Sequence, residues 1–277
     1  MSDIVLSAGV RSNLLQLQQT SDLMTRTQTR LATGKRVNSA LDNAINFFTA
    51  QGLDNRANDL SALLDSMSNA INTIQAANNG ITAMTKLVQS AQSLVSQARQ
   101  TSDSATRSTL ETQFNALLDQ IGQLAGDSGF NGVNLLGNDS LTVNFNEDAT
   151  SSTTITGVDY TNANASPLSI ADAVNWGANN GVGDTNIDTA SDDLTAALTV
   201  LRSESQTLSA NLSTVQIRQD FTKATINTLQ NGSASLTLAD SNEEGANLLA
   251  LQTRQQLSTT ALSLSAQADQ NVLRLFQ

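Results

Sequence analysis

The chain has 277 residues and a net charge of −11, with 39% hydrophobic but only 3% aromatic residues and no Cys or His. This composition excludes disulfides, thiolate or imidazole metal sites, and catalytic devices built on His or Cys, so we expect no cofactor and no enzymatic activity. No apolar run approaches the roughly 18 residues of a membrane span, and we expect no membrane insertion.

The first predicted helix covers residues 10–31 and carries a heptad stripe. Two polar positions interrupt this stripe, so the helix should need a partner. Its members are Val10, Leu14, Leu17, Ser21, Met24, Gln28 and Leu31. Gly34 suits the left-handed cap that ends a helix. Ser39, followed three residues later by Asp42, predicts the amino-terminal cap of the next helix.

The second predicted helix, residues 43–97, has the most regular pattern in the chain. From Leu63 to Ala98 each position on steps of four and three is apolar, which predicts a long helix packed against another along its length. We assign to its core Leu63, Met67, Ile74, Ile81 and Val88. The stripe continues through Gly80, so we expect a tolerated glycine rather than a break. A third, shorter helix follows, with Leu110, Phe114 and Ile121 in register.

The middle of the chain is acidic and changes period. Leu141, Val143 and Phe145 alternate with polar residues and predict a β-hairpin whose second strand lies within 153–158. Residues 169–176 predict a short helix. Ten acids lie between Gly126 and Asp193, while no Lys or Arg occurs between Arg107 and Arg202. This segment should form a solvated anionic outer face, and nucleic acid is excluded as a partner.

The return helix is predicted to begin near Thr189 and to end at residues 231–233. Its core positions include Leu201, Leu208 and Leu212. Ser241 with Glu244 predicts the capping box of the last helix. That helix has an apolar stripe which, with Leu14, Leu17 and Leu31, should be left for contacts with further subunits. The stripe and chain end include Leu257, Leu264, Val272, Leu275 and Phe276.

Together these patterns predict a mainly α fold, a long antiparallel coiled-coil bundle formed by both halves of the chain, with a small outer region containing a β-hairpin. We expect three parts. Residues 1–37 with 238–277 form a terminal helical domain, residues 38–160 with 188–237 a helical rod with the hairpin, and residues 161–187 a short outward-facing variable segment.

Several stretches resemble bacterial flagellins. Residues 30–44, RLATGKRVNSALDNA, are similar to the signature that follows the first flagellin helix, and residues 130–136, FNGVNLL, to a flagellin turn. Asp240 and Glu244 fall on an acid pair near the start of the last flagellin helix, and residues 267–276 resemble the flagellin ending. The resemblance covers residues 1–160 and 190–277 and indicates a short-centre, alphaproteobacterial variant.

The resemblance implies a secreted, extracellular structural subunit of the flagellar filament, which self-assembles into a helical tube for motility. It implies as partners further copies of the chain, other flagellins, hook-associated junction and cap proteins, the flagellar export chaperone and the type III export apparatus. The alternatives are a hook–filament junction protein of the same family and a non-flagellar coiled-coil scaffold.

The resemblance also bears on the mammalian innate-immune receptor for flagellin. Flagellins that this receptor recognises carry two arginines and a glutamate on the long rod. The matching positions here are Ser90, Gln92 and Ser93, which lack all three charges. We therefore expect weak recognition.

Overall fold

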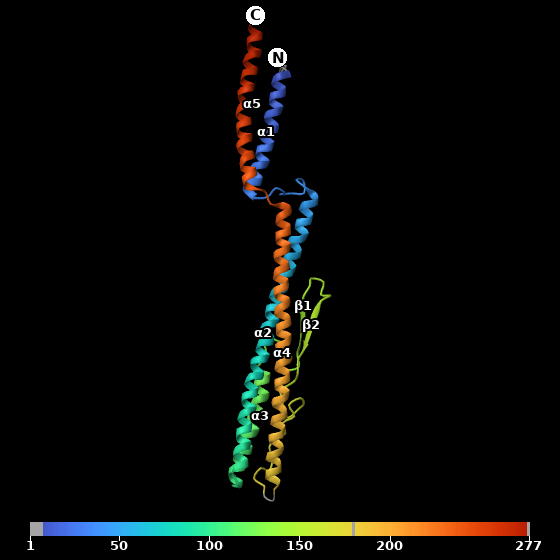
Figure 1. The fold of residues 1–277 in the computed structure, drawn as a ribbon, viewed down its shortest axis with the longest axis vertical. Helices are drawn as coiled ribbons and strands as arrows, with labels where there is room; N and C mark the ends of the chain where they lie inside the picture. The colour runs from blue at the N-terminus through green and yellow to red at the C-terminus, as the bar shows by residue number, and fades with distance from the viewer. Residues whose placement is uncertain (1–7, 179–180, 276–277) are drawn as a thin grey trace. The chain divides into compact units, whose positions relative to one another are not determined.

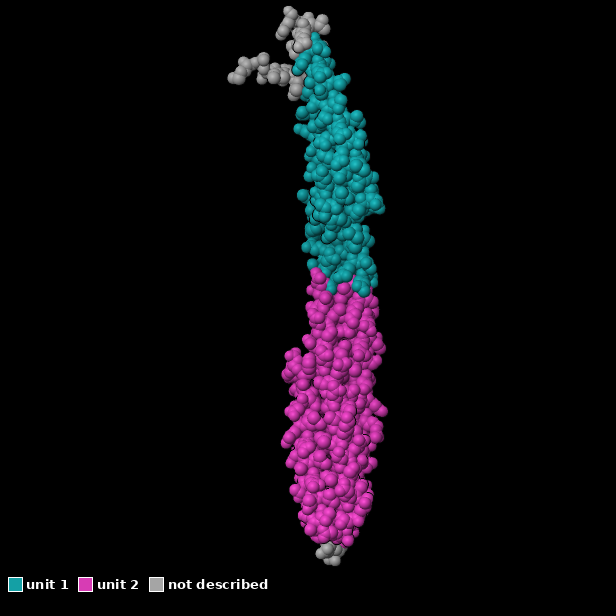
Figure 2. Space-filling view, turned by 90° about the vertical axis from the view of Figure 1, so that its left-hand side faces the viewer, with its two compact units in different colours: residues 1–57, 227–277 teal, residues 58–226 magenta. Residues whose placement is uncertain are grey.

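A computed structural model describes residues 8–178 and 181–275 and has five helices and two strands in these ranges (Figure 1). The chain divides into two compact units, residues 1–57 with 227–277 and residues 58–226 (Figure 2). Helices α2 and α4 contribute segments to both units. Within the described part of the chain, no helix has the length and apolarity needed to cross a membrane. The predicted fold class, mainly α with a small hairpin, is confirmed.

The first unit is built on α1 (Ala8–Thr33) and α5 (Ser241–Leu275), which lie side by side and antiparallel. Gly34 ends α1 with a φ of +67°, a left-handed conformation that glycine adopts without strain. The turn after Gly34 pairs with the segment between α4 and α5. Arg36 donates its N–H to the carbonyl of Thr237 at 2.7 Å, and Ala239 donates to that of Gly34 at 3.0 Å. These bonds connect the segment after α1 with the segment before α5, which are far apart in sequence.

The second unit is organised by α2 (Ala44–Gln100) and α4 (Val182–Thr237). The two helices run antiparallel, because Ser205 bonds to Asn78, while Gln219, further along α4, bonds to Ser68, which lies earlier on α2. Helix α3 (Ser104–Gly126) folds back beside α2, and its Phe114 and Ile121 are fully buried. One continuous hydrophobic core therefore runs between the three helices.

Helix α2 passes through Gly80 without a break, as predicted, and the structure shows why glycine stands there. A Cβ at Gly80 would collide with the side chain of Ser128 and would lie 2.8 Å from Cδ1 of Leu136. The helix therefore accepts the cost of a glycine, about 1 kcal/mol relative to alanine, so that the turn after α3 can approach closely.

Strands β1 (Ser140–Asn144) and β2 (Ser152–Thr156) form the predicted antiparallel hairpin. Leu141 pairs with Ile155 and Val143 with Thr153. Val143 and Ile155 are buried, so one face of the hairpin covers the helical core while the other carries threonines.

Three expectations about helix ends and one about a whole helix are wrong. Helix α2 begins at Ala44, one residue after its predicted start, but its cap is Asn43, which accepts the N–H of Asn46, and not Ser39. Helix α4 begins at Val182 and continues to Thr237. Residues 169–176 form no helix. Helix α5 is not capped by Ser241 and Glu244. Asp240 caps it by accepting the N–H of Asn242 at 2.8 Å, and Glu244 forms an ion pair with Arg30.

Candidate assembly surface

The contact between α1 and α5 contains buried polar side chains. Thr20 and Thr27 of α1 are buried in it, and Nδ2 of Asn13 donates to Oγ of Ser265 at 3.2 Å. Leucines are partly buried along the rest of the seam, at Leu17, Leu248, Leu251 and Leu262. Such a seam buries little apolar surface, which limits the stability of the pair.

An ion pair closes the seam near Gly34. Nη1 of Arg30 lies 2.9 Å from Oε1 of Glu244, whose residue is only 6% exposed. The two residues are 214 positions apart in sequence. Nε of Arg30 is buried and has no hydrogen-bond partner. The carboxylate of Glu244 has little access to water, and this guanidinium provides the opposite charge beside it.

Further large apolar side chains lie on the outer faces of both helices, outside the seam. Leu15 is 59% exposed and Leu257 67%. The exposed set comprises Leu14, Leu15, Leu23 and Leu31 on α1 and Leu249, Leu257 and Leu264 on α5. We call these seven residues the outer leucine set. Clustered leucines exposed on neighbouring helices are typical of a surface that contacts another protein.

The predicted assembly residues fall into three groups. Leu14, Leu31, Leu257 and Leu264 belong to the outer leucine set, and Leu17 is half-buried in the seam. Val272 and Leu275 lie in α5, but their side chains are outside the described part of the chain, as is all of Phe276. Sequence reasoning missed Leu15, Leu23 and Leu249, which stand beside the heptad stripe rather than on it.

A groove with three arginines runs along the same helix pair. It encloses about 410 Å³ and is lined by Leu23, Arg26, Arg30, Leu251 and Arg254, among others. In the described part of the chain, neither Arg26 nor Arg254 has an ion-pair partner. The groove therefore combines apolar walls with positive charge that the subunit itself does not neutralise.

The residues assigned to the rod core lie inside the second unit. Met67, Ile74, Ile81, Val88, Leu201 and Leu208 are buried. Leu63 and Leu212 are half-buried at the margin of the same core.

The three positions matched to the receptor epitope lie on α2. Ser90 and Ser93 are exposed and Gln92 is half-buried. Oγ of Ser90 donates to the carbonyl of Lys86 at 3.0 Å, and Oγ of Ser93 to that of Gln89 at 3.2 Å. Both hydroxyls are therefore turned back onto their own helix.

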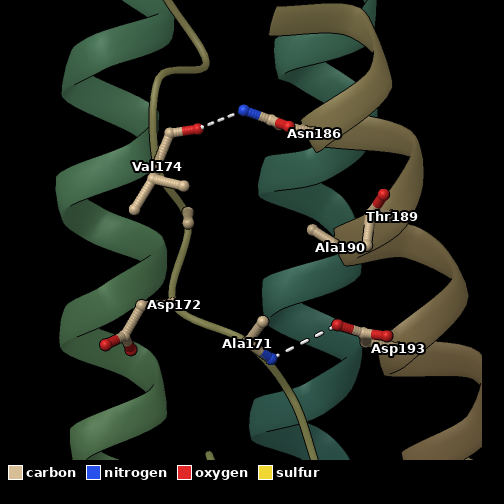
Figure 3. Close-up of a pocket in the computed structure, with 8 residues that line it drawn as sticks. Ala171, Asp172, Val174, Asn186, Thr189, Ala190 and Asp193 are labelled. Carbon is tan, nitrogen blue, oxygen red and sulfur yellow. Dashed lines mark hydrogen bonds between the residues drawn. The ribbon is translucent and has the colours of Figure 1, made fainter. Parts of the chain in front are cut away.

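The loop before α4 forms a small pocket of about 110 Å³ with that helix. Figure 3 shows that its polar groups hold the loop in place. Nδ2 of Asn186 donates to the carbonyl of Val174 at 2.8 Å, and the N–H of Ala171 donates to Oδ2 of Asp193 at 3.2 Å. We find no group of three metal-ligating side chains among the described residues. The pocket is explained as part of the loop's attachment.

Trp176 anchors this loop and is fully buried against Phe114, with ring centroids 5.1 Å apart. The backbone N–H of Trp176 donates to Oε2 of Glu111 at 2.8 Å, and Asn115 bonds to both the backbone N–H and the carbonyl of Ala173. Polar side chains of α3 therefore hold an irregular loop in place. Sequence periodicity does not predict such contacts.

Comparison with known proteins agrees with this architecture. The family model for the bacterial flagellin N-terminal helical region matches residues 8–140. Flagellin FljM of Caulobacter vibrioides is 30% identical over 286 residues, covering 100% of this chain and 99% of the relative. A flagellin of Brucella melitensis is 27% identical, with 100% of both chains covered. Both genera fit the expected alphaproteobacterial lineage.

Among solved structures, that of Bacillus cereus flagellin matches 58% of this chain and 88% of its own, with a TM-score of 0.46 and 15% identity. The assignment rests on the sequence relatives, whose similarity extends over the whole chain. This protein belongs to the flagellin family.

Proposed function

We propose that this chain polymerises through the outer faces of α1 and α5 and thereby acts as a structural subunit of the bacterial flagellar filament. The flagellins are a family of structural rather than catalytic proteins, and a flagellin is a subunit of an extracellular filament. The proposal adds which surfaces of the subunit contact other copies of the chain.

The outer leucine set is the observation that carries the proposal. Thr20 and Thr27 occupy the seam, whereas Leu15, Leu257 and Leu264 face outward. In a subunit that stays monomeric, the outward leucines contribute little to stability, since a leucine contributes about 1.5–3 kcal/mol only when it is fully buried. In a polymer the outward leucines of one copy can pack against those of the next, and the pair is then stabilised from outside.

The three expected parts fit this role. Residues 1–37 with 238–277 would form the inner, assembling layer, and residues 38–160 with 188–237 the surrounding rod. Residues 161–187 would face outward. The weak α1–α5 seam also suits a subunit exported unfolded through the type III apparatus with its chaperone, and added beneath a distal cap, because its ends would order fully only in the polymer.

The experiment compares two double variants of the purified full-length protein. Leu257→Gln with Leu264→Gln removes two leucines from the outer set. Ile217→Gln with Phe221→Gln removes two similarly exposed apolar residues from α4. We expect the first variant to remain in the supernatant after high-speed centrifugation, with helix content unchanged by circular dichroism, while the control sediments as filaments. Normal filaments from the first variant would contradict the proposal.

The full-length similarity to flagellins favours the filament subunit over the two alternatives. A hook–filament junction protein would occupy a short joint at the filament base, and a cytoplasmic scaffold would stay inside the cell. Labelling the native protein along isolated filaments separates these cases, because only the filament subunit is found along the full length.

A further inference from the structure

The charge of the protein is divided unequally between its two units. Residues 58–226 hold six basic against seventeen acidic residues, a net charge of −11, whereas the other unit is neutral overall. If the chain forms a polymer, strongly negative units must lie near one another, and their repulsion extends over a Debye length of about 8 Å. Some cations should therefore contact acids of neighbouring copies.

Most cations of this unit already have a partner within the subunit. Arg99 lies 2.5 Å from Asp188, Arg107 2.7 Å from Asp184, and Lys223 3.5 Å from Asp220. Arg218 lies over the ring of Phe145, 5.2 Å from its centroid. Among the described residues, Lys86 and Arg202 have neither an ion pair nor an aromatic partner.

These two free cations line the same groove between α2 and α4, which encloses about 330 Å³. The apolar part of its lining is formed by Ile81, Leu198 and Leu201, and its polar part includes Gln89. Two positive charges beside an apolar floor, with an amide as hydrogen-bond donor, suit a carboxylate carried on a protein segment.

We infer that this Lys86–Arg202 groove binds carboxylates of a second copy of this chain, supplied by its acid-rich segment, residues 127–193. That segment has ten acids and no Lys or Arg, so it is complementary in charge to the groove. Two of its acids, Asp184 and Asp188, pair with Arg107 and Arg99 within the same subunit. The inference rests on the proposed polymer and adds a contact between rods to the contacts of the terminal helices.

Assembly of charge variants tests the groove first. Lys86→Gln with Arg202→Gln has the same net charge as the control Lys223→Gln with Arg99→Gln, which removes cations that are paired within the subunit. We expect the groove variant to raise the critical concentration for polymerisation about tenfold over the control. This is the change expected when two surface ion pairs between copies are lost. Equal critical concentrations would overturn the inference.

Cross-linking then identifies the partner. Filaments are grown from equal parts of ¹⁴N- and ¹⁵N-labelled protein and treated with a carbodiimide, which joins a lysine amine to a contacting carboxylate. We expect mixed-isotope peptides linking Lys86 to an acid within 127–193. Links confined to one isotope, or to acids outside that segment, would overturn the inference. Unmodified protein that forms no filaments would contradict the proposed function instead.

Discussion

Arg30 and Glu244 form an ion pair between the end of α1 and the start of α5, with 2.9 Å between Nη1 and Oε1. It is the ion pair that joins the two terminal helices in the described part of the chain. We expect Glu244→Gln to lower the stability of the terminal unit by about 2 kcal/mol, since it leaves the Arg30 charge partly buried beside a neutral amide. Hydrogen exchange at α1 and α5 amides measures the loss.

The neighbouring acid gives a matched control. Glu243 is exposed, so Glu243→Gln should leave exchange unchanged within about 0.5 kcal/mol. Reversing the pair with Arg30→Glu and Glu244→Arg should recover part of the stability. Equal protection in Glu244→Gln and Glu243→Gln would show that the ion pair does not stabilise the helix contact.

Two glycines of α2 should respond to alanine in opposite directions. Gly52 has open space around its Cα, so Gly52→Ala should raise stability by about 0.5–1 kcal/mol through helix propensity. Gly80→Ala should lower stability by about 1–3 kcal/mol, because the new methyl group collides with Ser128 and Leu136. Urea denaturation of the monomers decides. A stabilising Gly80→Ala would show that the turn after α3 is not packed this closely.

Glu204 should make the rod sensitive to pH. Burial raises the pKa of the Glu204 carboxyl above the ordinary 4.5. The pKa of the buried Tyr160 is also raised, mainly by burial and in addition by the negative charge of Glu204. The folded state therefore binds the Glu204 proton more tightly than the unfolded state. Its favourable contribution is present at low pH and falls as pH rises through the ordinary and then the raised pKa.

We expect Glu204→Gln to raise the melting temperature at pH 8, where the native carboxyl is charged, and to leave it nearly unchanged at pH 4. Asp65→Asn removes the same charge from an exposed position of α2 and serves as the control. A larger stabilisation at pH 4 than at pH 8 would contradict the direction of the pKa shift.

The regular helices could be read from the sequence because their stripes are periodic. The stripe from Leu63 onward predicted α2, and alternation at Leu141 and Val143 predicted β1. Element ends were less predictable, since several side chains compete for the same cap. Ser241 and Glu244 fit a capping box, yet Glu244 pairs with Arg30 from the other end of the chain and Asp240 caps the helix. Local patterns do not contain such distant partners.

The loop before α4 shows the same limit. Residues 169–176 contain helix-forming residues, but Trp176 is held against Phe114 and the backbone of Ala173 bonds to Asn115. On α5, Leu257 and Leu264 of the predicted stripe face outward. The partly buried Leu248, Leu251 and Leu262 form the seam beside Ser258 and Ser265. Periodicity finds a helix face but does not say which of two faces meets the partner in the same subunit.

The receptor epitope gives a prediction separate from assembly. We expect this protein to stimulate the mammalian flagellin receptor poorly, because loss of charged contacts from a desolvated interface costs about 2–5 kcal/mol and at least about tenfold in affinity. Ser90→Arg with Gln92→Arg and Ser93→Glu should restore part of the signal in a reporter-cell assay on monomer. Ser90 and Ser93 are exposed, so the triple variant should keep its helix content. Strong signalling by the unmodified protein would contradict the matching of Ser90, Gln92 and Ser93 to the charged epitope positions.

The most direct test of assembly through α1 and α5 is a helical reconstruction of the polymer grown from this protein. Assembly through these helices should bury Leu257 and Leu264 of one copy against terminal helices of neighbouring copies, while the Arg30–Glu244 pair stays within each subunit. A filament in which these leucines remain in contact with solvent, with subunits joined only through residues 58–226, would contradict it.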